Sequence, residues 1–171
     1  LTVVPADSTT WYVTPGQTGS GGLGTDQRPW TDISHALSEL PAQSGDTLML
    51  QEGTHLLSAP AVVPVGIHIT GAGIGRTIIA GSFSEDVGSL NAILRDGALQ
   101  LVSDTFIDGD QSISHISFRG NRELGAAINV RRRHNIHVHH VEFTDLRYFG
   151  FSIYGNTGYS STNQVALDSE K

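Results

Sequence analysis

One stretch of this chain repeats itself after 25 residues, and the repeat limits the folds open to it. Residues 113–118 (ISHISF) align with residues 138–143 (VHHVEF), so that every apolar position falls on an apolar position. The same offset places Ile128 on Ile153. Two blocks that match at one offset, with no gap between them, are typical of a stacked repeat.

Each block predicts two short β-strands joined by a bend. The pattern is apolar, polar, any, apolar, polar, apolar, which is strand alternation and not the stripe of a helix. His115 and His140 occupy the bend, where stacked polar residues indicate a structural ladder. One such turn cannot bury its inner face alone, but it can do so when stacked on copies of itself. We therefore expect Ile113 and Val138 to lie about 4.8 Å apart on neighbouring turns.

Composition excludes several classes of protein. A chain of 171 residues predicts one domain with a real core. The net charge is −7, and the one basic run is Arg131-Arg132-Arg133, which argues against a nucleic-acid-binding protein. There is no cysteine, so no disulfide framework is expected. No apolar run approaches the roughly 18 residues of a membrane span.

One segment near the start has a helical pattern. Thr31 or Asp32 can cap the helix, and Pro41 ends it. Apolar residues recur on one face of this segment, at Ile33, Ala36, Leu37 and Leu40.

The order of the opening motifs resembles a known superfamily. The motifs are residues 12–16 (YVTPG), a Gly-rich loop, the helix at 30–40, and residues 45–50 (GDTLML) followed by Gly53-Thr54. Together they resemble the start of right-handed parallel β-helix proteins of the pectin-lyase-like superfamily. The resemblance implies an N-terminal α-helical cap and about four to five turns. It divides the chain into a lead-in with the capping helix at 1–44 and β-helix turns at 45–171.

The resemblance also bears on function. It implies a secreted, extracellular, carbohydrate-active protein that acts on a polysaccharide, as a lyase or a glycoside hydrolase. The alternative is a non-catalytic module for glycan binding, adhesion or self-assembly. Enzymes of the superfamily usually have more turns, so we expect further chain or a partner to cover the last one. The Asp-Pro-His-Asp, Gly-x-Asp-Asp, Gly-His-Gly and Arg-x-Pro-x-x-Arg motifs of its enzymes are absent, so no catalytic residue transfers by identity.

The candidate catalytic residues are Arg132, His137 and His139. Alternation with Ile136 and Val138 predicts that both histidines point outward, and outward side chains form the substrate groove in the superfamily. Arginine can pair with a uronate carboxylate, and histidine can take a proton or bind a metal. A solvated strand face is the simpler alternative for this cluster.

Three further groups are candidates for binding. Arg131, Arg133, Tyr148 and Tyr154 are the candidate substrate-binding residues, the tyrosines through stacking on sugar rings. Asp104, Asp108 and Asp110 are the densest carboxylate cluster and the candidate metal ligands, with Ca²⁺ as the ion. The same carboxylates could form an acid–base pair, or accept backbone N–H groups in a turn.

Overall fold

The structure is a computed structural model that describes residues 8–16, 22–42, 44–81, 83, 97–154 and 165–168. Ten strands and one short helix make up this part of the chain. In chain order they are β1 (Thr10–Val13), α1 (Ile33–Glu39), β2 (Thr47–Leu50), β3 (Gly53–Leu57), β4 (Ala61–Val62), β5 (His68–Gly71), β6 (Thr77–Gly81), β7 (Gly97–Arg119), β8 (Ala126–Thr144), β9 (Phe149–Tyr154) and β10 (Val165–Asp168).

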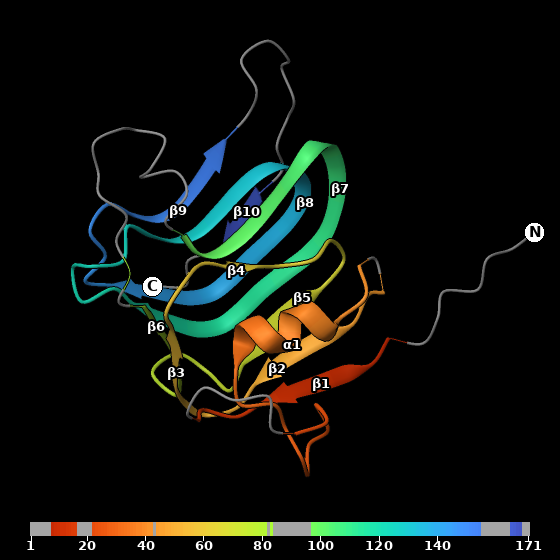
Figure 1. Cartoon of the computed structure of the whole chain (residues 1–171). Helices are drawn as coiled ribbons and strands as arrows, with labels where there is room; N and C mark the ends of the chain where they lie inside the picture. Colours follow the sequence, from red (N-terminus) through yellow and green to blue (C-terminus); the bar gives the residue numbers. More distant parts are fainter. Residues whose placement is uncertain are drawn as a thin grey trace, which may run out of the picture.

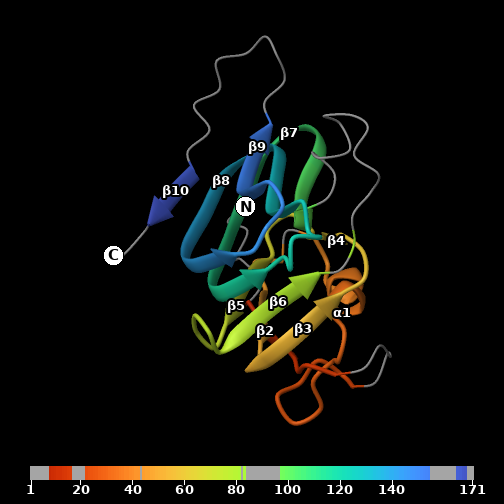
Figure 2. The ribbon, with the colours of Figure 1, turned by 90° about the vertical axis from the view of Figure 1, so that its left-hand side faces the viewer.

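The strands wind into four successive turns, which Figure 1 and Figure 2 show from two sides. β2, β3 and β4 form the first turn, and β5, β6 and the start of β7 form the second. The rest of β7 leads into β8 as the third turn, and the rest of β8 leads into β9 as the fourth. β1 pairs with β2 below the first turn, and β10 pairs with β8 above the fourth. Every pairing of these strands is parallel, which confirms the predicted all-β solenoid.

The first repeat block has the register that the sequence predicts. Ile113 pairs with Val138, and Phe118 pairs with Phe143, both at the offset of 25 residues. The predicted bends are also present, because His115 and His140 have left-handed φ angles of 59° and 52°. This conformation turns the chain sharply without ending the strand.

The second repeat block was predicted with the wrong register. Ile128 pairs with Phe151 and not with Ile153, an offset of 23 residues. The connection from β8 to β9 covers residues 145–148, two fewer than the connection at 120–125 one turn below. A shift by two residues preserves the alternation of a strand, so the inward-facing residues stay inward. The offset read from the sequence therefore held only until a turn changed its length.

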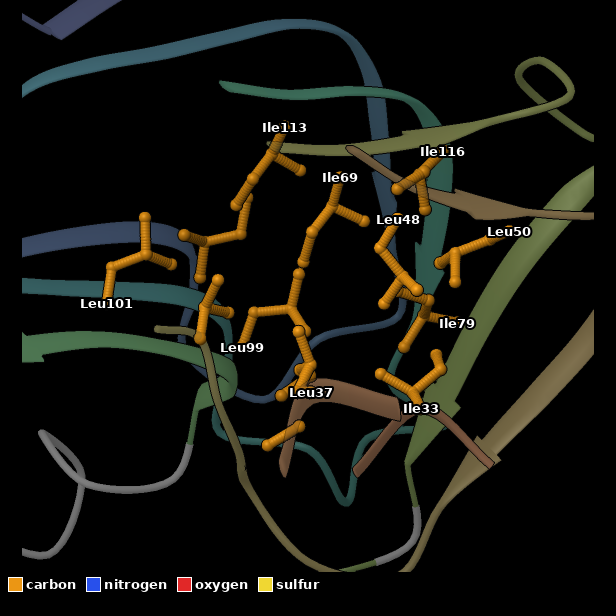
Figure 3. Packing of buried hydrophobic residues seen from close by; sticks show 14 of the residues in the cluster. Ile33, Leu37, Leu48, Leu50, Ile69, Ile79, Leu99, Leu101, Ile113 and Ile116 are labelled. Carbon is orange, nitrogen blue, oxygen red and sulfur yellow. The ribbon is translucent and has the colours of Figure 1, made fainter. Parts of the chain in front are cut away.

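Columns of apolar side chains fill the interior of the solenoid. Leu48, Ile69, Ile113 and Val138 lie one above another on β2, β5, β7 and β8, and none is more than 1% exposed. Figure 3 shows this column among its neighbours in the core. Each member is covered by the turn above and the turn below, so stacking buries what a single turn would expose.

The described residues contain one short helix, α1, where the sequence predicts a helix. The Asp32 side chain caps it by accepting a hydrogen bond from the His35 backbone N–H at 2.7 Å. Leu40, ahead of Pro41, leaves the helical conformation. Ile33 and Leu37 point into the core beside the strands, as Figure 3 shows. In this part of the chain, no helix is long and apolar enough to cross a membrane.

His55 is a buried polar residue in a column of core positions. It is in register with Ile79 one turn above, and Ile79 is in register with Phe118. The ring is 3% exposed, and its Nε2 lies 2.9 Å from the Gln51 carbonyl oxygen, to which it donates. Burial lowers the pKa of His55, and the hydrogen bond to Gln51 opposes this effect in part.

We expect truncation of Ile113 to destabilise the protein far more than truncation of an exposed isoleucine. Ile113→Ala leaves a cavity between two turns and should lower the free energy of unfolding by about 2–5 kcal/mol. Ile74, at 48% exposure, is the matched control, and Ile74→Ala should change stability by no more than about 0.5 kcal/mol. Urea unfolding followed by circular dichroism measures both. Equal effects would contradict the stacked core.

We expect His55 to make the protein less stable in acid. Because its pKa is lowered in the folded state, the unfolded chain takes up the proton first as the pH falls. The stability that neutral His55 contributes is complete above the unfolded pKa of 6.5 and is lost as the pH falls below it. His55→Gln retains a donor for the Gln51 carbonyl but does not titrate. Between about pH 7.5 and about pH 5, wild type should lose more unfolding free energy than this variant. Parallel losses would contradict the role of His55.

Candidate functional site

The outward side of β5, β7 and β8 carries a continuous set of polar side chains. We call this set the polar face, and it comprises His68, Thr70, Ser112, Ser114, His137 and His139. Thr70 is in register with Ser114, Ser114 with His139, and Ser112 with His137. The residues between them, Ile69, Ile113 and Val138, point into the core, so alternation turns the polar residues outward.

Hydrogen bonds join the lower two turns of the polar face. The Ser112 backbone N–H donates to His68 Nδ1 at 3.1 Å, and Ser112 Oγ lies 3.0 Å from the same nitrogen. Because a backbone N–H can only donate, Nδ1 is the acceptor and the neutral His68 ring carries its proton on Nε2. Ser114 Oγ donates to Thr70 Oγ1 at 3.0 Å. The hydroxyl groups and the imidazole are thus held in fixed positions by the stacking of turns.

Four imidazole rings gather at the upper end of this face. We call His115, His137, His139 and His140 the histidine cluster. His115 and His140 stack at 4.9 Å between ring centroids and 5° between ring planes, which is the ladder predicted at the bend. The rings of His137 and His139 are 4.5 Å apart, and His139 Nδ1 lies 2.8 Å from His140 Nδ1. His137 is exposed and His139 is half-buried, so the predicted outward orientation of both is confirmed.

The three arginines of the basic run have three different environments. Arg131 is exposed at the end of the strand segment that pairs with β9. Arg132, with a left-handed φ of 56°, donates from Nη1 to the Asp104 carbonyl oxygen on the turn below. It therefore contacts a bulge of β7, and not the two histidines with which it was grouped from the sequence.

Arg133 is buried, which corrects its assignment as a substrate-binding residue. Its side chain is 4% exposed and donates four hydrogen bonds. The acceptors are Ser103 Oγ at 2.9 Å, the Val63 carbonyl oxygen at 2.7 Å, Gln111 Oε1 at 2.8 Å and the Val102 carbonyl oxygen at 2.7 Å. Burial lowers the pKa of Arg133 to about 10, so the guanidinium stays charged at neutral pH. Arg133 thus ties three turns together at one corner of the solenoid.

The three aspartates do not come together as a metal site. Asp104 is exposed in the bulge between Val102 and Ile107, and Asp108 Oδ1 accepts the Asp110 backbone N–H at 3.1 Å. Asp110 turns the chain with a φ of 43°. Within the described ranges, no three His, Cys, Asp or Glu side chains are placed to hold an ion together. The geometry matches the alternative in which these carboxylates support turns.

The predicted aromatic contacts lie on the fourth turn. Tyr148 is 37% exposed, and the Arg147 guanidinium carbon lies 5.3 Å from the centre of its ring. One side of this ring is therefore covered by a cation. The backbone of Tyr154 ends β9, while its side chain lies outside the described structure.

Sequence reasoning missed His68 and Ser112. The offset between β5 and β7 is 44 residues, because Ile69 pairs with Ile113. That distance does not match the repeat of 25, so the two residues could not be placed on neighbouring turns. The available signal was the shared alternation of residues 67–70 (IHIT) and 111–114 (QSIS).

Comparisons with known proteins identify the fold. No protein-family profile and no curated protein sequence matches the chain. The structure is similar to the pectin methylesterase PemA from Erwinia chrysanthemi, with a TM-score of 0.57 and 13% identity over 84% of this chain and 46% of that one. It is also similar to a pectin methylesterase mutant in complex with a hexasaccharide, with a TM-score of 0.54 and 11% identity over 88% of this chain and 48% of that one. The chain has the pectin-lyase-like β-helix fold and spans less than half the length of these two structures.

We expect Arg133 to be essential for stability. Arg133→Met leaves buried acceptors without donors and should cost about 3 kcal/mol or more. Arg133→Lys should also destabilise, because an ammonium has three donors and cannot reproduce the planar fork. The matched control is Arg131→Met at the exposed neighbour, with an effect within about 0.5 kcal/mol. Thermal and urea unfolding measure all three, and an Arg133→Met variant as stable as Arg131→Met would contradict the assignment.

Proposed function

We propose that this chain is a secreted, extracellular carbohydrate-active protein whose ligand is an acidic, pectin-type polysaccharide. The observation that carries the proposal is the polar face, with histidines and hydroxyl groups in register on successive turns of a pectin-lyase-like β-helix. Two structures with this fold are pectin methylesterases, and one of them holds a hexasaccharide. A polymer with repeating hydroxyl and carboxyl groups complements a surface that repeats turn by turn.

The polar face offers both partners that a sugar hydroxyl needs. Ser112, Ser114 and Thr70 can donate and accept, and the half-buried His68 presents Nε2–H as a donor. Their positions are set by the turns on either side, so little side-chain freedom is lost when a ligand binds. These groups lie in two columns that run along the stack of turns.

Cationic groups beside the polar face would receive the carboxylates of the polymer. The chain has a net charge of −7, so an anionic ligand requires local positive charge. The exposed Arg131 and the half-buried Arg132 precede the corner at Asn135, and His137 follows it. In this proposal Arg131 and Arg132 pair with uronate carboxylates. The exposed ring of Tyr148 supports a stacking contact with a sugar, and Tyr154 is proposed for the same role.

Proton transfer is assigned to the two outward histidines of β8. His137 is exposed and His139 lies directly beside it, so a substrate on the polar face can reach both. An imidazole can remove a proton from a carbon next to a carboxylate, as a lyase requires, or assist the hydrolysis of a glycosidic bond. The proposed reaction is therefore of lyase or glycoside hydrolase type, with Arg132 neutralising the carboxylate.

The same proposal divides the chain at residue 44. Residues 1–44 would form a lead-in and an N-terminal cap, with α1 closing the first turn, and residues 45–171 would form the β-helix. The burial of Ile33, Ala36 and Leu37 in the common core supports the capping role. The pairing of β1 with β2 makes the lead-in continuous with the stack.

A non-catalytic role in glycan binding, adhesion or self-assembly is the second candidate. Among the described strands, β9 pairs with β8 alone, and its Phe149 and Ile153 are 48% and 39% exposed. A strand edge with exposed apolar residues can pair with further chain or with a partner. Sedimentation separates the candidates, because monomers with turnover support the enzyme and end-to-end filaments without turnover support the module.

We expect a panel of acidic polysaccharides to include a substrate whose turnover depends on the outward histidines. His139→Ala should lower kcat by about 10²–10⁴-fold, since a proton-transfer group is lost. His134→Ala is the control, because His134 is exposed on the same strand but outside the polar face. Product release is measured at 235 nm for a lyase and as reducing ends for a hydrolase. An unchanged rate in His139→Ala would remove this residue from the mechanism.

A further inference from the structure

Two imidazole nitrogens face each other at the bend of β8. His139 Nδ1 and His140 Nδ1 are 2.8 Å apart, and the two rings are nearly perpendicular, at 84°. Adjacent residues of a regular strand point to opposite sides. Here the left-handed φ of His140, at 52°, brings both side chains to the same place. The contact is thus a product of the bend.

The distance between these nitrogens is that of two ligands on one metal ion. Metal–imidazole bonds are about 2.0 Å long, so two nitrogens at a right angle around an ion lie about 2.8 Å apart. Ligands at the tetrahedral angle would lie about 3.3 Å apart. The observed 2.8 Å therefore fits adjacent positions of a square-planar or tetragonal site, the geometry of Cu²⁺ and Ni²⁺.

The surroundings hold the pair ready for an ion. His140 is stacked on His115 at 4.9 Å, which fixes the plane of its ring. His137 lies 4.5 Å from His139 on the exposed side, so an ion at the pair would be next to a third imidazole and to solvent. Groups that orient a metal ligand usually strengthen the site.

We infer that His139 and His140 form a two-imidazole site for a divalent transition metal, with Cu²⁺ as the preferred ion. Both rings bind as neutral ligands through Nδ1. The proton that Nδ1 of one ring shares with the other moves to Nε2 of the same ring, and water completes the coordination. Imidazole is a good ligand for copper, nickel and zinc, and the intrinsic order of affinities places Cu²⁺ above Ni²⁺ and Zn²⁺. The inference rests on the nitrogen pair and is independent of the proposed action on polysaccharides.

The test is titration of the purified chain with Cu²⁺, Ni²⁺ and Zn²⁺ as chlorides, followed by calorimetry and by electron paramagnetic resonance of the copper form. We expect one strong copper site whose spectrum shows two equivalent nitrogen ligands. His139→Gln and His140→Asn should each weaken copper binding by at least about tenfold. Asparagine is chosen because it tolerates the left-handed backbone at position 140.

Two control variants separate the nitrogen pair from surface histidines in general. His115→Asn changes a residue with nearly the same backbone angle, 59°, but leaves both nitrogens of the pair in place. His134→Gln removes an exposed histidine outside the cluster. Both controls should keep the strong site with its two-nitrogen spectrum. Circular dichroism establishes that every variant is folded.

Two results would overturn the inference. One is copper binding in His139→Gln and His140→Asn as tight as in wild type. The other is a loss in His134→Gln as large as in the pair variants, which would show adventitious binding by exposed histidines. Neither result bears on polysaccharide turnover, which is measured without added metal.

Discussion

The structure depends on the burial of each turn by its neighbours. A turn of the solenoid has an apolar inner side that cannot be covered from within the turn. The column of Leu48, Ile69, Ile113 and Val138 shows the solution, in which parallel pairing places each residue over the next. Alternation along the strands then directs the residues between them outward. The polar face is therefore a direct consequence of the way the core is built.

The sequence predicts the architecture well because alternation and repetition are local properties. The register of Ile113 with Val138, the bends at His115 and His140, and the cap and end of α1 can all be read from neighbouring residues. The register of the fourth turn could not be read in this way. It depends on the length of the connection into β9, which changes by two residues without changing the pattern of side chains.

The candidate site was harder to predict, because it depends on which turns are adjacent. His137 and His139 follow from alternation along one strand, whereas His68 and Ser112 are 44 residues apart in the sequence and meet only after the chain has wound round. Arg133 shows the opposite error. Its position in a basic run suggested exposure, but acceptors from residues as distant as Val63 and Gln111 surround its guanidinium. Such a set of acceptors exists only in the folded chain.

The unequal lengths of the turns have a consequence for how such a chain can change. The step from Ile69 to Ile113 takes 44 residues and the step from Ile113 to Val138 takes 25, yet both pairs lie in one unbroken column. Additional residues can therefore be carried outside the stack while the residues that define it keep their places. Because loop closure grows only slowly in cost with length, new segments can be grafted between turns at modest expense to folding. A scaffold of this kind separates the evolution of its surface from the conservation of its interior.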